Sequence, residues 1–301
     1  MRPMSPLLGI DAGGSSTRAV LVDGEQVTEL RTGPPMNALL TSDIGGRLAA
    51  IIRGVPDVAA IGIGMPGLRS PDEAAALGAA LSASAGRPVT VTGDGQIAQA
   101  GAFRGGPGIV VIAGTGSAAV GWDGSRRVRA GGHGFLLGDE GSAYWIGREA
   151  IAAALHWADG MGGSAPIHRA VVEAAGLGLD ELIVKINTHP SERQCVTGFA
   201  TVLADLALTD PVARRIIDRA ADHLVALAMA VQRRLAPSVS GSGPVSVSGS
   251  GPVPLPVAGG GGVFSSPLIW ERFAEQTGAT RPQASPAVGA ALMAAEGLPS
   301  A

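Results

Sequence analysis

Acidic residues beside glycines are the first candidates for chemistry in this 301-residue sequence. Asp11 ends a short apolar run, Asp94 lies between two glycines, and Asp139 and Glu140 are adjacent within GGHGFLLGDEGSAYWIGRE. Glycines let the backbone approach a ligand closely and adopt φ > 0. Carboxylates accept hydrogen bonds from hydroxyl groups and can take their protons. These acids therefore predict polar, ligand-facing turns rather than packing positions.

The stretch Gly131–Glu149 carries the most distinctive of these turns. It opens with a nearly continuous glycine turn and runs into a predicted helix that starts at Gly141 or Ser142. The N-terminus of that helix would place free N–H groups next to the two acids. We interpret the stretch as the floor of a polar pocket.

Two strand–turn–strand patterns with glycine, serine and threonine turns have the same form. The first turn, AGGSST, joins Pro6–Asp11 to Arg18–Val22, and the second, GTGS, joins Ile109–Ala113 to Ala118–Trp122. The backbone N–H groups of such a tip can surround a phosphate. One such hairpin can be an ordinary surface turn, but two of them, about one domain apart, indicate a duplicated fold that grips one polyphosphate. The P-loop pattern GxxxxGK[ST] does not occur.

A third candidate loop for nucleotide binding lies near the end of the chain. A predicted strand, Pro252–Ala258, leads into the glycine turn Gly259–Gly262 and then into a predicted helix, Ser266–Thr277. Helix N-termini that follow glycine loops bind phosphate and other anions.

Asp94 follows the predicted strand Pro88–Thr92 and precedes the predicted helix Gln96–Phe103. Open α/β sheets bind ligands at the carboxyl ends of their strands, so this acid is a candidate functional residue. The alternative is that it only caps the helix. Asn37, in the loop TGPPMNAL, is by itself more typical of a turn residue.

Composition limits the possible functions. The hydrophobic content is 46%, the mean hydropathy is +0.30 and the formal charge is −3, which are typical of a globular protein and do not favour nucleic acid or a membrane as the main partner. A single cysteine, Cys195, excludes an intrachain disulfide framework and an intrachain cysteine-ligated cluster. We expect a cytoplasmic enzyme or ATPase.

The glycine-rich segment Gly105–Gly108 is the predicted domain boundary. We expect one domain over residues 1–105 and a second over 106–285, with the C-terminal helix, 286–301, packing back onto the first. The repeat PSVSGSGPVSVSGSG at 237–251 favours a loop-like insertion, with two short strands as the alternative.

In this order, the motifs resemble the N-acetylglucosamine kinase branch of the BadF/BadG/BcrA/BcrD ATPase family, within the sugar kinase/actin/heat-shock ATPase superfamily. GDEGSAYWIG is the most specific motif, and GIDAGGSST, Asp94, VIAGTGS and GGGGVFSSP follow the family's order. The resemblance covers nearly the whole chain. It implies an α/β fold of two RNase-H-like (actin-like ATPase) domains, each with a central mixed sheet, and a cleft between them.

The resemblance also implies an ATP-dependent amino-sugar kinase that phosphorylates the 6-hydroxyl of N-acetylglucosamine, with ATP and Mg²⁺ as cofactors. Asp94 corresponds to the catalytic base, and Asp11 to the acid near Mg²⁺, through water. The implied ATP and phosphate contacts are Asp11, Gly13, Gly14, Ser15, Gly114, Thr115, Gly116, Gly260, Gly261, Gly262 and Ser265. The implied sugar contacts are Asn37, Asp94, Ser117, Gly132, His133, Gly134 and Asp139. Glu140 is expected to brace its turn, and the family suggests a homodimer.

Three alternatives remain at this point. Glucosamine is the main competing substrate, because His133 replaces a tryptophan of eukaryotic members and Asn37 is followed by Ala-Leu instead of His-Trp. An ATPase activator of the BadF type would need cysteines for an iron–sulfur cluster, and this chain has one. A non-catalytic sugar sensor would not need the predicted base, Asp94.

Overall fold

The computed structural model describes residues 6–13, 16–39, 41–55, 57–188, 194–236 and 254–296, with the side chains of Arg31, Thr32 and Gln194 left out. The chain forms two compact units. The first consists of Met1–Gly108 together with Pro282–Ala301, and the second of Ile109–Arg281. The predicted insertion at 237–251 lies outside the described residues.

The first unit is built on a five-stranded mixed sheet of order β3-β2-β1-β4-β5. The strands β1 (Leu7–Ala12), β2 (Thr17–Asp23) and β3 (Gln26–Gly33) are antiparallel, whereas β4 (Ala60–Met65) and β5 (Val89–Gly93) run parallel to β1. The helices are α1 (Ile44–Arg53), α2 (Pro71–Ala85), α3 (Asp94–Ala102) and α10 (Pro286–Ala295).

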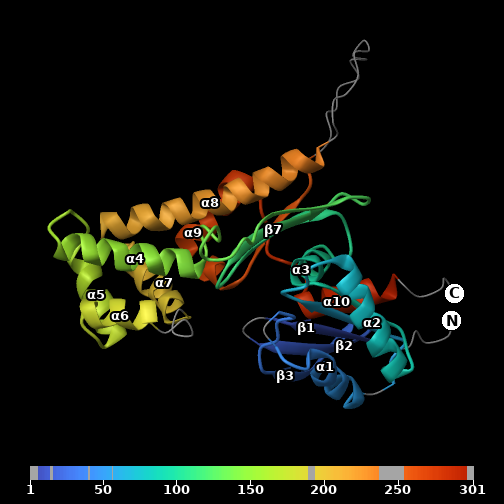
Figure 1. Cartoon of the computed structure of the whole chain (residues 1–301). Helices are drawn as coiled ribbons and strands as arrows, with labels where there is room; N and C mark the ends of the chain where they lie inside the picture. Colours follow the sequence, from blue (N-terminus) through green and yellow to red (C-terminus); the bar gives the residue numbers. More distant parts are fainter. Residues whose placement is uncertain are drawn as a thin grey trace, which may run out of the picture. The chain divides into compact units, whose positions relative to one another are not determined.

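The alternation of side chains along β1 separates the two faces of this sheet. Leu8 and Ile10 join one core with residues of α1 and α2, whereas Leu7 joins another with residues of α10. On the α10 face, Gly9 is needed because a Cβ atom there would collide with the carbonyl oxygen of Ala287. The last helix of the described chain thus packs directly against the backbone of the first strand (Figure 1).

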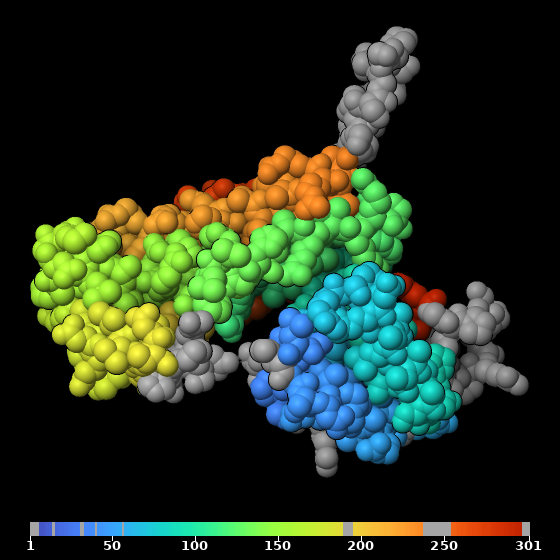
Figure 2. All heavy atoms as spheres, viewed as in Figure 1, coloured from blue at the N-terminus to red at the C-terminus, as the bar shows by residue number. Residues whose placement is uncertain are grey.

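The second unit contains a four-stranded mixed sheet of order β8-β7-β6-β9. Its strands are β6 (Gly108–Ala113), β7 (Ser117–Trp122), β8 (Arg127–Gly131) and β9 (Val257–Gly260), and η2 (Gly262–Ser265) is a short 3₁₀ helix. Its helices are α4 (Ala143–Ala158), α5 (Ala165–Ala175), α6 (Leu179–Thr188), α7 (Gln194–Leu206), α8 (Pro211–Leu235) and α9 (Pro267–Thr277). The long helix α8 lies along α4 (Figures 1 and 2).

Close approaches of backbone also hold the second unit together. A Cβ atom on Gly147 of α4 would collide with the carbonyl oxygen of Val196 on α7. The helices are rich in alanine, and Ala220, Ala221 and Ala228 of α8 are all buried. Because small side chains let helices approach closely, this core needs few aromatic residues.

The prediction of an α/β protein with a mixed sheet in each of two units is confirmed. Two local predictions are wrong. Gly259 and Gly260 lie in β9 rather than in a turn, because they pair with Val111 and Ile112 of β6. In addition, α3 begins at Asp94 itself, two residues earlier than predicted.

No single helix among the described residues has the length and apolar composition of a membrane span. One pair, Cys195–Leu206 and Pro211–Leu235, meets those criteria only when taken together and is bent by 115°.

Candidate active site

Asp11 and Asp94 lie at the same edge of the first sheet. Asp11 pairs with Gly64 of β4, which in turn pairs with Thr92 of β5, and Asp94 follows two residues later. The three strands are parallel here, so their carboxyl ends meet at this edge. The sheet therefore brings together two acids that are 83 positions apart in the sequence.

Asp94 is an exposed carboxylate at the first position of α3. The N-cap residue is Gly93, without a side-chain capping bond, and Asp94 Oδ1 accepts a hydrogen bond from the N–H of Gly95 at 2.8 Å. The alternative that Asp94 serves as the helix N-cap is therefore not supported. Its position in the first turn lets the positive end of the helix dipole stabilise its charge.

Asp11 is partly buried, and its protonation is coupled to Asp94. Burial first, and then the negative charge of Asp94, raise the pKa of Asp11 to about 6 against the opposing effect of Arg18. A partly buried carboxyl group next to a second negative charge is suited to binding a cation, which would stabilise its ionised form. The predicted base thus has a second acid beside it at this edge of the sheet.

The loop that carries Asn37 is fixed to the same edge. The N–H of Met36 donates to the carbonyl of Gly13 at 3.0 Å, and the N–H of Ala38 donates to the carbonyl of Pro66 at 3.0 Å. Asn37 Oδ1 accepts the N–H of Leu39 at 2.9 Å. This bond orients the amide, so that Asn37 can present its Nδ2 donor and the second lone pair of Oδ1 to a ligand.

In the second unit, Asp139 adopts the left-handed conformation with φ 61°. This conformation is uncommon for a residue with a Cβ atom and is found preferentially at functional turns. Burial raises the pKa of Asp139, while the N–H groups of Ser117 and Gly134 donate to its carboxylate and oppose that effect. The side chain lies over Gly116, since a Cβ atom there would fall 2.7 Å from Asp139 Oδ2.

The N-terminus of α4 is anchored to the loop after β6. The N–H groups of Ala143 and Tyr144 donate to the carbonyls of Gly114 and Thr115 at 2.8 and 3.4 Å, and Ser142 Oγ accepts the N–H of Trp145. The prediction that these N–H groups are free beside the acids is therefore wrong. They position the candidate phosphate loop instead of meeting a ligand.

Ser117 and Glu140 support the same turn. Ser117 is buried, and its hydroxyl donates to the carbonyl of Glu140 at 2.8 Å. Ser117 was predicted to contact the sugar. Its hydroxyl proton is already used within the turn, and its N–H donates to Asp139. Glu140 braces the turn through its backbone, and its side chain is exposed.

The two glycine loops of the second unit lie at one edge of its sheet. Gly260 of β9 is parallel to and paired with Ile112 of β6, so the loops after these strands begin side by side. Gly261, with φ 102°, passes so close to the carbonyl of Ala113 that a Cβ atom would not fit. Ser265 Oγ donates to the carbonyl of Gly262 at 2.7 Å and is exposed. A nucleotide could contact both loops from this edge.

The glycine turn before Asp139 is open to solvent at His133 and Gly134. Arg129, in the middle of β8, donates through Nη2 to the carbonyl of Gly132 at 2.7 Å. Arg129 was not a predicted site residue. Arg127 and Arg129 lie two residues apart in an edge strand, so their side chains share one face. This pattern could have indicated that Arg129 faces the turn.

The structure places the predicted residues in two groups, one in each unit. Asp11, Gly13, Asn37 and Asp94 lie at the edge of the first sheet, and the remaining described residues belong to the loops of the second. Gly14 and Ser15, predicted to contact phosphate, lie outside the described residues.

The sequence pattern of the BadF/BadG/BcrA/BcrD ATPase family matches residues 8–294. The chain belongs to this family. It is 30% identical over 243 residues to the N-acetylmuramic acid/N-acetylglucosamine kinase of Clostridium acetobutylicum, a match that covers 76% of this chain and 79% of that protein.

Solved structures show that this family member shares its fold with sugar kinases. A candidate N-acetylglucosamine kinase from Chromobacterium violaceum matches 97% of this chain and 99% of its own, with a TM-score of 0.73 and 24% identity. A ROK family glucokinase from Streptomyces griseus, solved with glucose and AMPPNP, matches 97% and 100% of the two chains, with a TM-score of 0.57 and 19% identity. The prediction of an ATP-dependent kinase of the sugar-kinase type is confirmed at this level.

Proposed function

We propose that the protein transfers the γ-phosphoryl group of ATP to the 6-hydroxyl of an amino sugar, with N-acetylglucosamine as the substrate. The proposal depends on one observation above all. Asp94 is an exposed carboxylate at the carboxyl edge of the first sheet, beside the partly buried Asp11. An exposed carboxylate is accessible to a substrate hydroxyl, which supports a role as general base.

Asp94 would accept the proton of the sugar hydroxyl as its oxygen bonds to phosphorus. Phosphoryl transfer otherwise depends on positioning and charge neutralisation. The backbone of Gly13 in the first unit, and of Thr115 and Gly116 in the second, would donate N–H groups to the phosphates. The N–H of Gly114 donates to the carbonyl of Gly116 at 2.9 Å and so shapes the loop. Gly260, Gly261, Gly262 and Ser265 would contact the adenosine side.

Asp11 fits a role beside Mg²⁺. Burial and the charge of Asp94 raise the pKa of its carboxyl group, so a cation would stabilise the ionised form of Asp11. Mg²⁺ is commonly bound by one or two carboxylates, water and the substrate phosphates, with no cage made of protein alone. When bound, the ion would neutralise charge on the phosphate oxygens.

Asp139 would hold the sugar in place. Its carboxylate is fixed by two backbone N–H groups and would accept hydrogen bonds from sugar hydroxyls. Asn37 would donate from Nδ2, and the open turn with Gly132, His133 and Gly134 would lie along the sugar. None of these residues is assigned to the acetyl group, and glucosamine is therefore the competing substrate.

Asp94→Asn tests the proposal. We expect kcat to fall by about 10²–10⁴-fold, the usual contribution of a general base, while the affinity for the sugar changes little. Turnover is measured by coupled ADP release, and sugar binding by calorimetry. A variant that keeps the wild-type kcat would show that Asp94 is not the base.

N-Acetylmuramic acid is a second candidate substrate because the Clostridium acetobutylicum relative is named for it. This sugar differs from N-acetylglucosamine by a lactyl ether that carries a carboxylate, and Arg129 places a guanidinium at Gly132 in the open turn. A panel of N-acetylglucosamine, glucosamine, N-acetylmuramic acid, N-acetylmannosamine and glucose would rank the substrates by kcat/KM. Arg129→Gln would lower only the value for N-acetylmuramic acid if the guanidinium contacts the lactyl group.

A further inference from the structure

The single lysine and the single cysteine of the chain line the same cavity. Of the 22 lysine and arginine residues, only Lys185 is a lysine, and Cys195 is the one cysteine. They border a cavity of about 190 Å³ in the second unit, together with Ala174, Ala175, Leu177, Leu182, Gly198 and Phe199. The cavity lies among α5, α6 and α7, a region at the surface of that unit (yellow in Figure 2).

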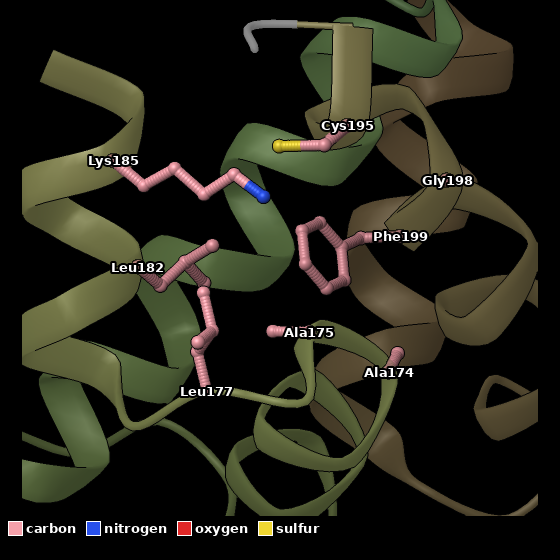
Figure 3. A pocket seen from close by; sticks show the side chains of 8 residues that line it. All are labelled: Ala174, Ala175, Leu177, Leu182, Lys185, Cys195, Gly198 and Phe199. Atoms are coloured by element: carbon pink, nitrogen blue, oxygen red, sulfur yellow. The ribbon is translucent and has the colours of Figure 1, made fainter. Parts of the chain in front are cut away.

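The cavity combines an apolar floor with one cation. Leu182 and Phe199 are 2% and 4% exposed and form the buried part of the wall. The Lys185 side chain crosses from α6 and the Cys195 thiol points from α7, so that both groups reach the same space (Figure 3). Among the described residues that line the cavity, none is acidic.

This lining selects for a particular class of ligand. The volume is several times the roughly 30 Å³ that one water molecule occupies in the liquid. Inorganic anions and sugars would leave the leucine and phenylalanine walls without apolar contacts, whereas an uncharged hydrocarbon would gain nothing from the ammonium. An ammonium on a flexible stem can move to meet a carboxylate and exchange partners with it.

We propose that this cavity binds a small organic acid with an apolar body. The carboxylate would lie against the Lys185 ammonium, and the hydrocarbon against Leu182 and Phe199. The site is separate from the glycine loops and acidic residues assigned to ATP and sugar, and belongs to no step of the proposed phosphoryl transfer.

The single thiol provides a direct assay, because all alkylation of cysteine by iodoacetamide occurs at Cys195. Octanoate is the probe, and octan-1-ol has the same apolar body without the charge. We expect octanoate to slow alkylation saturably, by about fivefold when it is present at a few times its Kd. Octan-1-ol should protect far less.

Two variants separate the charge from the cavity. Lys185→Met removes the ammonium and should reduce octanoate protection to the level of octan-1-ol, while Lys185→Arg should keep part of it. Gly198→Leu should fill the cavity and abolish the effect of octanoate, because a Cβ atom at Gly198 meets nothing within 4 Å. Its matched control, Gly198→Ala, should keep the protection.

Each rate is compared with and without ligand in the same variant, so any shielding by the new side chain cancels. Octanoate should also raise the Tm of the wild type and Gly198→Ala, but not of Gly198→Leu, and circular dichroism shows that each variant is folded. The proposal is overturned if octanoate gives the wild type no saturable protection, or protects Lys185→Met or Gly198→Leu equally well.

Discussion

The carboxylate of Asp139 lies directly over the backbone of Gly116, at a separation that leaves no room for a side chain at position 116. This contact joins the turn assigned to the sugar with the loop assigned to phosphate, both within the second unit. The left-handed backbone of Asp139 and the N–H groups of Ser117 and Gly134 hold the carboxylate there. Substitutions at either residue should therefore change sugar binding in measurable ways.

Gly116→Ala should weaken sugar binding. The new Cβ atom would fall 2.7 Å from Asp139 Oδ2 and force the carboxylate away from its N–H donors. We expect the KM for the sugar to rise about tenfold, equivalent to about 1.4 kcal/mol. Gly114→Ala is the matched control, since a Cβ atom there meets nothing within 4 Å. An equal rise in sugar KM in both variants would contradict the role of this contact.

Asp139→Asn should remove the negative charge at this position while keeping the conformation of the turn. Asparagine is one of the few residues that tolerate the left-handed conformation, so the turn should persist. The loss of charge-assisted hydrogen bonds should lower kcat/KM for the sugar by about 10–100-fold. Steady-state kinetics and thermal unfolding measure the two effects. A variant with full activity would show that the carboxylate does not contact the sugar.

Asp11 should make the metal-free, nucleotide-free protein less stable as the pH rises. Its folded-state pKa is about 6 and its ordinary value is 3.8. Between these values the folded state binds more protons than the unfolded state, so the free energy of unfolding falls with increasing pH. The loss through this group is at most about 3 kcal/mol, for a shift of roughly two units.

Asp11→Asn should remove this contribution. In urea denaturation with EDTA, the variant should be more stable than the wild type at pH 7 and closer to it at pH 4, although it loses kinase activity. Asp94→Asn should also reduce the loss of stability between pH 4 and pH 7, because the charge of Asp94 raises the pKa of Asp11. If the difference between Asp11→Asn and the wild type did not depend on pH, the assigned coupling would be wrong.

Gly62→Ala should destabilise the first unit severely. A Cβ atom on Gly62 of β4 would collide with the carbonyl oxygen of Ala290 on α10, and rigid backbone cannot yield as a side chain does. We expect a loss of about 3 kcal/mol or more in the free energy of unfolding. Gly45→Ala, in α1, is the control and should be neutral or stabilising by about 0.5–1 kcal/mol, because nothing lies within 4 Å and alanine favours helix.

The sequence by itself determined the local features of this protein. Strand–turn–helix patterns are local, so periodicity and glycine placed Asp94 at the carboxyl end of a strand and identified the loop Gly114–Ser117. The motif GDEGSAYWIG indicated the family, which the match over residues 8–294 shows. Charge and cysteine content limited the classes of partner, because both depend on composition and not on how the chain folds.

Only the tertiary structure decided which of these groups meet. The proximity of Asp11 and Asp94 follows from the parallel pairing of three strands, and Gly259 and Gly260 became strand residues because β6 pairs with them. The N–H groups at the start of α4, which the sequence suggested as ligand donors, anchor the phosphate loop instead. Lys185 and Cys195 line one cavity. Such contacts join residues that are remote in the chain, and local backbone preferences carry no information about them.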